Sequence, residues 1–366
     1  MKTAPSICHG LGLTLLALVV SGLGLTAAAE TVVTVPVGAV TLEALANSDS
    51  YISIPLVRPP IFGGVVESKS GNALTLKGAN FVEGELQYQS GIQPNTYYLQ
   101  IASGSAVGQS STVLANTNQV ITCDYEQDIL DSLQVGDRVV IRPYWTLSTL
   151  FPAEKAGSYF EASSSNVGSG RKTEIIFPDV SSQGINKSAA SVYFFNSYWR
   201  RSGSVTVDRS DVIVPPDTYI VVRGNGYLKS TKLVVVGVVQ DFPNAVSLLS
   251  LASGKNDNPV GMLLPCPKAL QDLNLAGDGG VFASSTSNVG SGRGDELIVL
   301  DNTLAAKNKS ASAVYFYNSY WRKSGNVTVN QNATTLPAGS AIVIRKKQTG
   351  TAQVSDWSQP PAYTAN

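Results

Sequence analysis

Apolar and polar residues alternate along much of the chain with the period of two that is typical of half-buried β-strands. β-Branched and aromatic residues dominate these runs. The pattern predicts strands at 73–76, 97–101, 138–141, 191–195, 205–207, 219–222, 313–317 and 341–344. Helical spacing occurs only at Glu126–Leu133 and Lys268–Leu275. We therefore predict an all-β protein of sandwich or barrel modules with one or two short helices.

Two stretches of the chain are near copies of one another. Residues 160–223 align with residues 282–345 without a gap, and 33 of the 64 aligned positions are identical. Chance alone would give roughly four identities. The shared blocks are Asn-Val-Gly-Ser-Gly-Arg at 166–171 and 288–293, Asn-Lys-Ser-Ala at 186–189 and 308–311, and Asn-Ser-Tyr-Trp-Arg at 196–200 and 318–322. Such similarity indicates duplication of one β unit.

A fainter similarity links the segments that precede the two copies. Gly64–Leu76 resembles Gly237–Leu248, which is one residue shorter. Together the similarities predict two tandem related lobes with the order A-B-A′-B′. The predicted divisions are a signal peptide at 1–29, an N-terminal extension at 30–51, module A at 52–159, module B at 160–230, a short module A′ at 231–281, module B′ at 282–350 and a C-terminal tail at 351–366.

The first 29 residues have the pattern of a secretory signal peptide. Lys2 precedes an apolar run at Leu11–Leu25, and Ala27–Ala29 offers a small-residue cleavage site. A transmembrane anchor is the alternative, but it needs about 20 apolar residues. We therefore expect export to the cell surface, the extracellular space or the periplasm, with no integral membrane segment after cleavage.

Charge and histidine content exclude several classes of function. Lysine and arginine number 26, as do aspartate and glutamate, so no basic excess points to nucleic acid. The one histidine, His9, lies within the predicted signal peptide. Without it, Ser-His-Asp catalysis, Cys-His catalysis and histidine-ligated metal sites are excluded. We predict no catalytic residue, no metal site and no cofactor, and hence a protein that is not an enzyme.

Two cysteines remain after the predicted signal peptide. Cys123 and Cys266 are either a disulfide, which an oxidising compartment would permit, or two free thiols in strands.

The repeated aromatic segments are candidates for ligand stacking. Exposed tyrosine and tryptophan rings beside arginine could stack on sugar rings and hydrogen-bond their hydroxyl groups. The alternative is that each tryptophan fills the core of its module, with the arginine stacked on a ring or paired. The candidate residues are Tyr198, Trp199 and Arg200 in the first copy and Tyr320, Trp321 and Arg322 in the second.

Acid–base chemistry is left to carboxylates, which occur as equivalent pairs in the two copies. The pairs are Glu174 with Glu296 and Asp179 with Asp301. Paired positions favour a structural role, although one site using a member from each copy would suit a polysaccharide hydrolase. The loop Gly168–Thr173 resembles a phosphate loop but lacks Gly-Lys-Ser/Thr, which favours a tight turn.

The chain resembles a functionally uncharacterised family of exported bacterial β-rich proteins. The resemblance rests on Arg142–Leu147 with Leu150–Pro152, on Tyr97–Leu99, on the repeated blocks, and on Asp356-Trp357 with Pro360–Tyr363. It implies export and no known catalytic residues. We expect a non-enzymatic secreted or cell-surface structural and binding protein, with a surface glycan or a second copy of itself as partner. The alternatives are a glycan-binding module and the carboxylate-dependent hydrolase.

Overall fold

The computed structural model describes residues 36–227 and 229–363. The predicted signal peptide lies outside these residues. Strands dominate the described chain, so the predicted all-β class is confirmed. None of the helices in this part has the length and apolarity required to cross a membrane. The described residues form one compact unit.

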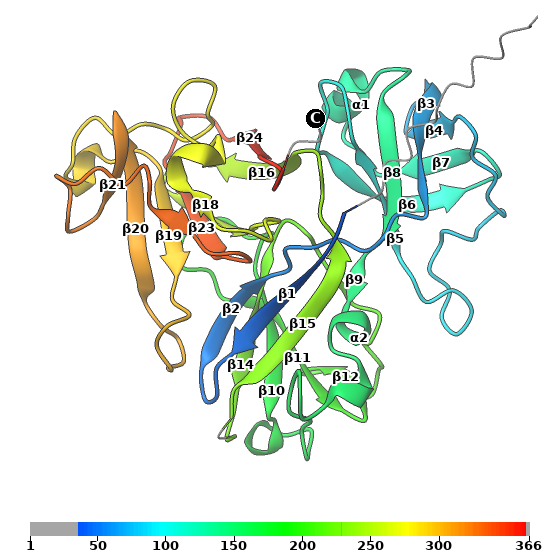
Figure 1. The fold of residues 1–366 in the computed structure, drawn as a ribbon, viewed down its shortest axis with the longest axis horizontal. Coiled ribbons are helices and arrows are strands. Elements are labelled where there is room, and N and C mark those ends of the chain that lie inside the picture. The colour runs from blue at the N-terminus through cyan, green and yellow to red at the C-terminus, as the bar shows by residue number, and fades with distance from the viewer. Residues whose placement is uncertain (1–35, 228, 364–366) are drawn as a thin grey trace, which may run out of the picture. The chain divides into compact units, whose positions relative to one another are not determined.

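Two antiparallel five-stranded sheets have corresponding strand orders (Figure 1). The first sheet runs, in order, β12 (Tyr198–Arg201), β11 (Ala189–Asn196), β10 (Thr173–Pro178), β14 (Tyr219–Gly224) and β2 (Asp49–Ser53). The second runs β21 (Tyr320–Lys323), β20 (Ala311–Asn318), β19 (Glu296–Leu300), β23 (Ala341–Lys346) and β17 (Asn256–Gly261). Each sheet thus takes four strands from one of the two repeated stretches and one edge strand from an earlier part of the chain.

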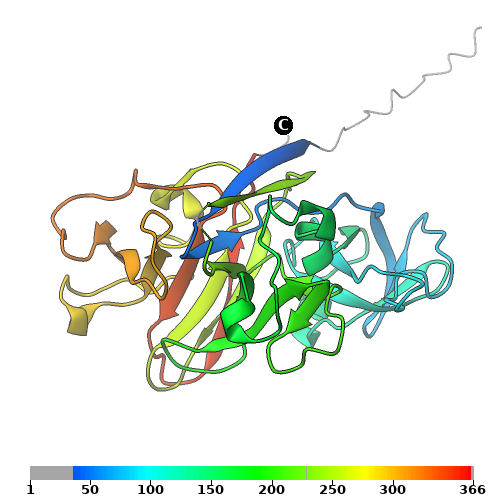
Figure 2. The same cartoon turned by 90° about the horizontal axis from the view of Figure 1, so that it is seen from below.

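Each sheet is accompanied by a two-stranded ribbon. The first ribbon pairs β1 (Val37–Ala44) with β15 (Thr231–Val238), which lie side by side in Figures 1 and 2. The second pairs β16 (Asn244–Ser250) with β24 (Gln353–Gln359). Smaller corresponding elements complete each copy: β9 (Trp145–Thr146), α2 (Leu147–Leu150), η1 (Ala153–Lys155), η2 (Gly168–Gly170) and β13 (Ile213–Val214) in the first, and β18 (Lys268–Ala269), η3 (Leu270–Leu273), η4 (Gly290–Gly292) and β22 (Thr335–Leu336) in the second.

Strand pairing divides the chain differently from the predicted modules. β1 comes from the predicted N-terminal extension and pairs with β15, which was assigned to module A′. β24 comes from the predicted C-terminal tail and pairs with β16. The tails were misassigned because a ribbon strand cannot be recognised without its distant partner. The corresponding units are therefore 37–53 with 145–238, and 244–359.

A closed six-stranded barrel is inserted between β2 and β9 of the first copy. Its strands, in sheet order, are β3 (Phe62–Ser70), β4 (Ala73–Leu76), β7 (Val120–Cys123), β6 (Ser110–Asn116), β5 (Tyr97–Ile101) and β8 (Arg138–Pro143), with helix α1 (Gln127–Ser132) between β7 and β8. In the second copy, residues 262–267 join β17 to β18 directly. The segment Gly64–Leu76 therefore belongs to the barrel and has no structural counterpart at Gly237–Leu248.

Both faces of each five-stranded sheet are buried. Ile175 and Val222 of the first sheet belong to the core formed with its own ribbon. Their neighbours Ile176 and Val221 belong to a separate cluster that also contains Val343 of the second sheet. Successive side chains in a strand point to opposite faces, so one sheet packs on its ribbon and, through its other face, on the second sheet.

The local predictions hold for most elements. The predicted strand at Val205–Val207 is wrong, because these residues form an irregular segment after the turn that follows β12. The side chain of Arg200 donates a hydrogen bond to the Val205 carbonyl oxygen, which engages the backbone outside any strand ladder. The predicted helix at Lys268–Leu275 is reduced to the short 3₁₀ turn η3.

Candidate functional site

A large concave surface lies between the two five-stranded sheets. This inter-sheet pocket has a volume of about 810 Å³. Ile176 and Val221 line it from the first sheet, and Ile298 and Val343 line it from the second. The pocket therefore has an apolar floor to which both copies contribute equivalent positions.

An arginine–aspartate pair lies at one side of the pocket. Arg223 of β14 donates from Nε and Nη2 to the two carboxylate oxygens of Asp49 on β2, at 2.6 and 2.9 Å. Asn308, from the second copy, accepts a hydrogen bond from Arg223 Nη2 at 2.8 Å. Its backbone N–H donates to Asp49 at 2.7 Å. A loop of the second copy thus completes a cluster that begins in the first.

The reciprocal arrangement lies at the other side. Arg345 of β23 donates from Nε and Nη2 to Asp257 of β17, at 2.7 and 3.0 Å. Asn186, from the first copy, accepts from Arg345 at 3.2 Å and donates its backbone N–H to Asp257 at 2.8 Å. We call these two clusters the crossed locks. Both asparagines have positive φ angles near 50°, a conformation that asparagine tolerates better than most residues.

Backbone hydrogen bonds reinforce the crossed locks along both edge strands. Each of the edge strands β2 and β17 donates amide N–H groups to carbonyl oxygens of the other copy. The bonds are Asp49 to Ala306 at 3.0 Å, Ser53 to Gly339 at 3.1 Å, Asp257 to Gly184 at 2.9 Å and Gly261 to Asp217 at 2.9 Å. The outer edges of β2 and β17, which would otherwise offer unpaired backbone groups, are therefore covered by the other copy within the same chain.

The electrostatics of the first crossed lock favour the ionised carboxylate. Burial raises the pKa of Asp49, but hydrogen bonds from Arg223 and Asn308 outweigh it and hold the pKa below its ordinary value. The hydrogen bonds that Arg223 donates to Asp49 in turn raise the pKa of Arg223. The pair is charged at neutral pH, as an ion pair with good geometry requires.

Two lysines, each next in sequence to an asparagine of the crossed locks, line the pocket. Lys187 donates to the Ser182 carbonyl oxygen at 3.0 Å, and Lys309 donates to the Leu304 carbonyl oxygen at 2.8 Å. Burial lowers the pKa of both. The charged residues that line the pocket are four cations and three carboxylates: Lys187, Lys309, Arg223 and Arg345, with Asp49, Asp179 and Asp257. The lining is thus nearly neutral overall.

The two halves of the pocket differ in aromatic content. Tyr51 and Tyr219 line the side that belongs to the first copy, with their rings edge to face at 6.1 Å between centroids. In the second copy, Pro259 pairs with Val343 as Tyr51 pairs with Val221 in the first, so a proline stands at the position of Tyr51. Ala341 stands at the position of Tyr219. Aromatic rings on which the apolar face of a ligand could pack therefore line the pocket only on the side of the first copy.

The tryptophans predicted for ligand stacking are core residues. Trp199 and Trp321 are each only 1% exposed. Trp199 packs against Phe151, Phe160 and Phe195, and its indole Nε1 donates to the Phe151 carbonyl oxygen at 3.2 Å. The stacking interpretation is wrong for both tryptophans, since a ligand cannot reach their faces.

The neighbouring tyrosines and arginines satisfy one another. The Arg200 guanidinium lies 3.6 Å from the ring centroid of Tyr198, and Arg322 lies 3.7 Å from that of Tyr320. Each arginine also donates to nearby backbone carbonyl groups, including Asn196 and Asn318. These side chains hold the hairpins β11–β12 and β20–β21, and they are not among the residues that line the inter-sheet pocket.

Of the two alternatives for Cys123 and Cys266, the structure has the two free thiols. Cys123 is fully buried in the barrel core, where burial raises the pKa of its thiol to about 12. Cys266 lies in the segment that joins β17 to β18 and is partly exposed. The barrel insertion separates the two cysteines, because it places Cys123 inside a separate core that Cys266 does not enter.

The paired carboxylates make local interactions. Asp179 accepts hydrogen bonds from Ser181 and Ser182, which hold its pKa far below the ordinary value. Asp301 accepts from the backbone and side chain of Thr303, which also lowers its pKa. A general acid needs a raised pKa, so these two residues are poorly suited to that role. They act as turn-capping acceptors.

The two glutamates bind cations of their own copies. Glu174 lies 3.5 Å from Arg171, and Glu296 lies 3.0 Å from Lys255 and 3.5 Å from Arg293. Neither glutamate lines the inter-sheet pocket.

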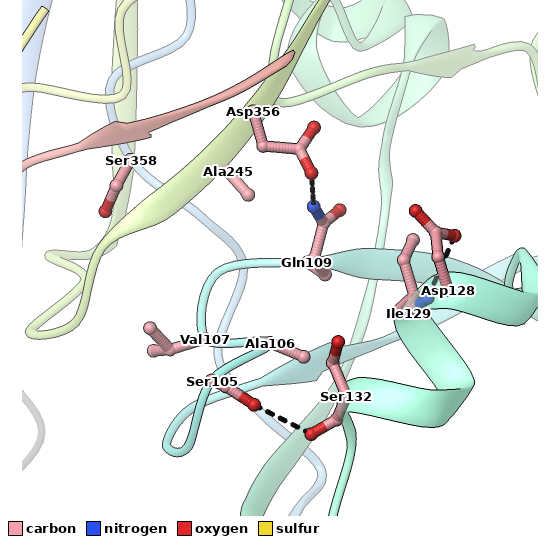
Figure 3. Close-up of a pocket in the computed structure, with 10 residues that line it drawn as sticks. All are labelled: Ser105, Ala106, Val107, Gln109, Asp128, Ile129, Ser132, Ala245, Asp356 and Ser358. Carbon is pink, nitrogen blue, oxygen red and sulfur yellow. Dashed lines mark hydrogen bonds between the residues drawn. The ribbon is translucent and has the colours of Figure 1, made fainter. Parts of the chain in front are cut away.

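A smaller pocket of about 260 Å³ lies where the barrel meets the second ribbon (Figure 3). Gln109 donates to Asp356 at 2.7 Å, and Ser105 donates to the Ser132 carbonyl oxygen at 2.9 Å. Asp356 also accepts from Ser247 at 2.7 Å. Its carboxylate is therefore engaged in holding the barrel against the ribbon. The inter-sheet pocket, which is larger and richer in polar groups, is the candidate functional site.

Sequence reasoning did not find the crossed locks. Asn186, Asn308, Arg223 and Arg345 are identical between the copies, and this identity was the available signal. Their aspartate partners lie outside the aligned stretches.

Comparison with known proteins gave no match: no family model, no curated protein and no solved structure is similar to the chain at a significant level. The resemblance to exported bacterial proteins thus stays a prediction.

Proposed function

We propose that the protein is a non-enzymatic, exported binding protein that holds a neutral oligosaccharide in the inter-sheet pocket. The observation that carries the proposal is the mixed character of that pocket. An apolar floor lies beside arginine, lysine, aspartate and asparagine side chains whose charges nearly cancel. A ligand with many hydroxyl groups, no net charge and apolar ring faces suits such a lining.

Tyrosine side chains supply a surface for a sugar ring. Tyr51 and Tyr219 line one half of the pocket, and both present an apolar ring with a polar tip. In this proposal they take the stacking role for which Trp199 and Trp321 were candidates. The glycan-binding alternative is therefore retained with different residues.

The pocket is also held in a fixed geometry. The crossed locks and the backbone bonds along β2 and β17 fix the two sheets against each other from both sides. A preformed site loses less conformational entropy when a ligand binds. Fixed walls suit a structural and binding component.

Blocking the pocket should abolish ligand binding. Ala311 lines the pocket and is exposed, so Ala311→Trp places a large ring in the space that a sugar would occupy. Isothermal titration with cellohexaose, maltohexaose and chitohexaose should detect binding of at least one to the wild type. The variant should bind it about tenfold more weakly or worse, a loss of about 1.4 kcal/mol or more.

Ala190→Trp is the matched control. Ala189 is the equivalent of Ala311 in the first copy and also lines the pocket. Its neighbour Ala190 is exposed in the same strand but does not line the pocket, so this variant should bind like the wild type. Absence of binding to all three hexasaccharides, or equal loss in both variants, would refute the proposal.

A further inference from the structure

A second concave site lies at the loop whose sequence resembles a phosphate loop. This basic pocket has a volume of about 360 Å³. Its lining residues come from the loop before β10, from the end of β14 with the turn that follows, and from the second copy. They are Gly168, Ser169, Arg171, Lys172, Glu174, Arg223, Asn225, Gly226 and Lys307.

Two lysines of the basic pocket converge on one turn. Lys172 Nζ donates to the Gly226 carbonyl oxygen at 3.2 Å, and Lys307 Nζ donates to Asn225 Oδ1. Within the described chain, neither ammonium group has a carboxylate within 4.0 Å. The two ammonium groups therefore bind the adjacent residues Asn225 and Gly226, and the oxygen atoms that accept their hydrogen bonds are uncharged.

The other charged groups of the basic pocket are already engaged. Arg171 lies 3.5 Å from Glu174 and stacks on the ring of Phe194 at 4.3 Å. Arg223 is held by Asp49 in the first crossed lock. The positive charge that is available to a ligand is consequently that of the two lysines.

The reciprocal site, which the equivalent residues of the opposite copies would form, lacks both lysines. At that reciprocal site, Gly294 of the second copy stands where the first copy has Lys172, and Ile185 of the first copy stands where the second copy has Lys307. A Cβ atom at Gly294 would lie 2.2 Å from the Ala283 carbonyl oxygen, so this position is closed to any side chain. Lys347 replaces Asn225 there, so the acceptor on which the lysines converge is also lost. The lysine pair, with one member from each copy, therefore occurs at only one of the two reciprocal sites.

The chemistry of the lysine pair specifies a class of ligand. An ammonium group is a compact charge with three donors, and lysine is a common phosphate ligand. Two of them at one turn are best neutralised by a group that carries two negative charges on neighbouring oxygens. We propose that the basic pocket binds a dianionic tetrahedral oxyanion of the phosphate or sulfate class between Lys172 and Lys307, with Ser169 as a further donor.

Titration with inorganic phosphate and with sulfate tests this proposal directly. Isothermal titration would use the purified protein at pH 7.5 and constant ionic strength, with chloride as the background anion. The wild type should bind both oxyanions. Lys172→Gly with Lys307→Ile, which introduces the two residues of the reciprocal site, should weaken binding at least about tenfold. Absence of wild-type binding, or unchanged affinity in this double variant, would overturn the proposal.

Three controls make the result specific. Lys77→Ala with Lys232→Ala removes the same charge from exposed positions outside the pocket and should leave the affinity unchanged. Lys172→Arg with Lys307→Arg should retain binding. At pH 5, where phosphate is mainly monoanionic, phosphate should bind more weakly while sulfate does not. Equal weakening of sulfate would contradict selection of the dianion.

The oxyanion site can be separated from the saccharide site by experiment. Lys172 and Lys307 do not line the inter-sheet pocket. The double variant should therefore bind oligosaccharides as the wild type does, and failure of either proposal leaves the other intact.

Discussion

Replacement of Trp199 by alanine should lower the free energy of unfolding by about 3–5 kcal/mol, the usual cost of removing a large aromatic side chain from a core. Trp199 is 1% exposed and lies among three phenylalanine rings. Its removal therefore leaves a cavity that these surrounding side chains cannot readily fill. Its indole hydrogen bond to Phe151 is also lost. Urea denaturation of the purified variant would measure the change.

Tyr198→Ala is the matched comparison in the same hairpin. Tyr198 is only partly buried and its main interaction is with Arg200, so we expect a loss of about 1 kcal/mol. If Trp199→Ala kept wild-type stability and instead lost saccharide binding, the assignment of this tryptophan to the core would be wrong.

Arg223→Met should destabilise the protein by roughly 2–3 kcal/mol. Removal of one partner from a buried ion pair leaves an unpaired charge and typically costs about 3–5 kcal/mol. The Arg223 side chain is 25% exposed, whereas Asp49 is 3% exposed, so solvent screening reduces the expected loss. The loss should appear in the denaturation of the whole protein, since Asp49 also binds the backbone of Asn308.

The pH dependence of this loss follows from the lowered pKa of Asp49. A carboxyl group with a depressed folded-state pKa contributes stability above its unfolded pKa, which is about 3.9. That contribution is lost as the pH falls through the folded-state pKa. The difference between wild type and Arg223→Met should be full at neutral pH and should shrink in acid below about pH 4. A difference that persists unchanged at pH 2 would contradict the role given to Asp49.

Alternating residues allowed the class of fold to be predicted, but the burial of both sheet faces concealed which residues form the site. A strand with one solvent face alternates in polarity, whereas β10 and β14 carry apolar residues on both faces because each sheet packs on two layers. Ile176 and Val221 of the pocket floor therefore had no signal that distinguished them from Ile175 and Val222 of the core.

Long sequence separation hid the crossed locks. Asp49 and Arg223 are 174 residues apart, and the barrel lies between them. The barrel also separates β2 from the rest of its sheet, so the repeat in the sequence begins only at residue 160. The edge strands β2 and β17 share little beyond one aspartate, which is too weak a similarity to reveal the corresponding halves.

Native-state hydrogen exchange gives the most direct test of the claim that the two copies interlock. The amides of Asp49, Ser53, Asp257 and Gly261 donate to carbonyl oxygens of the opposite copy. We predict that these edge-strand amides are as strongly protected as that of Ile175 in the central strand β10. Exchange as fast as that of exposed loop amides would show that β2 and β17 are open edges, and would contradict the interlocked arrangement on which the pocket depends.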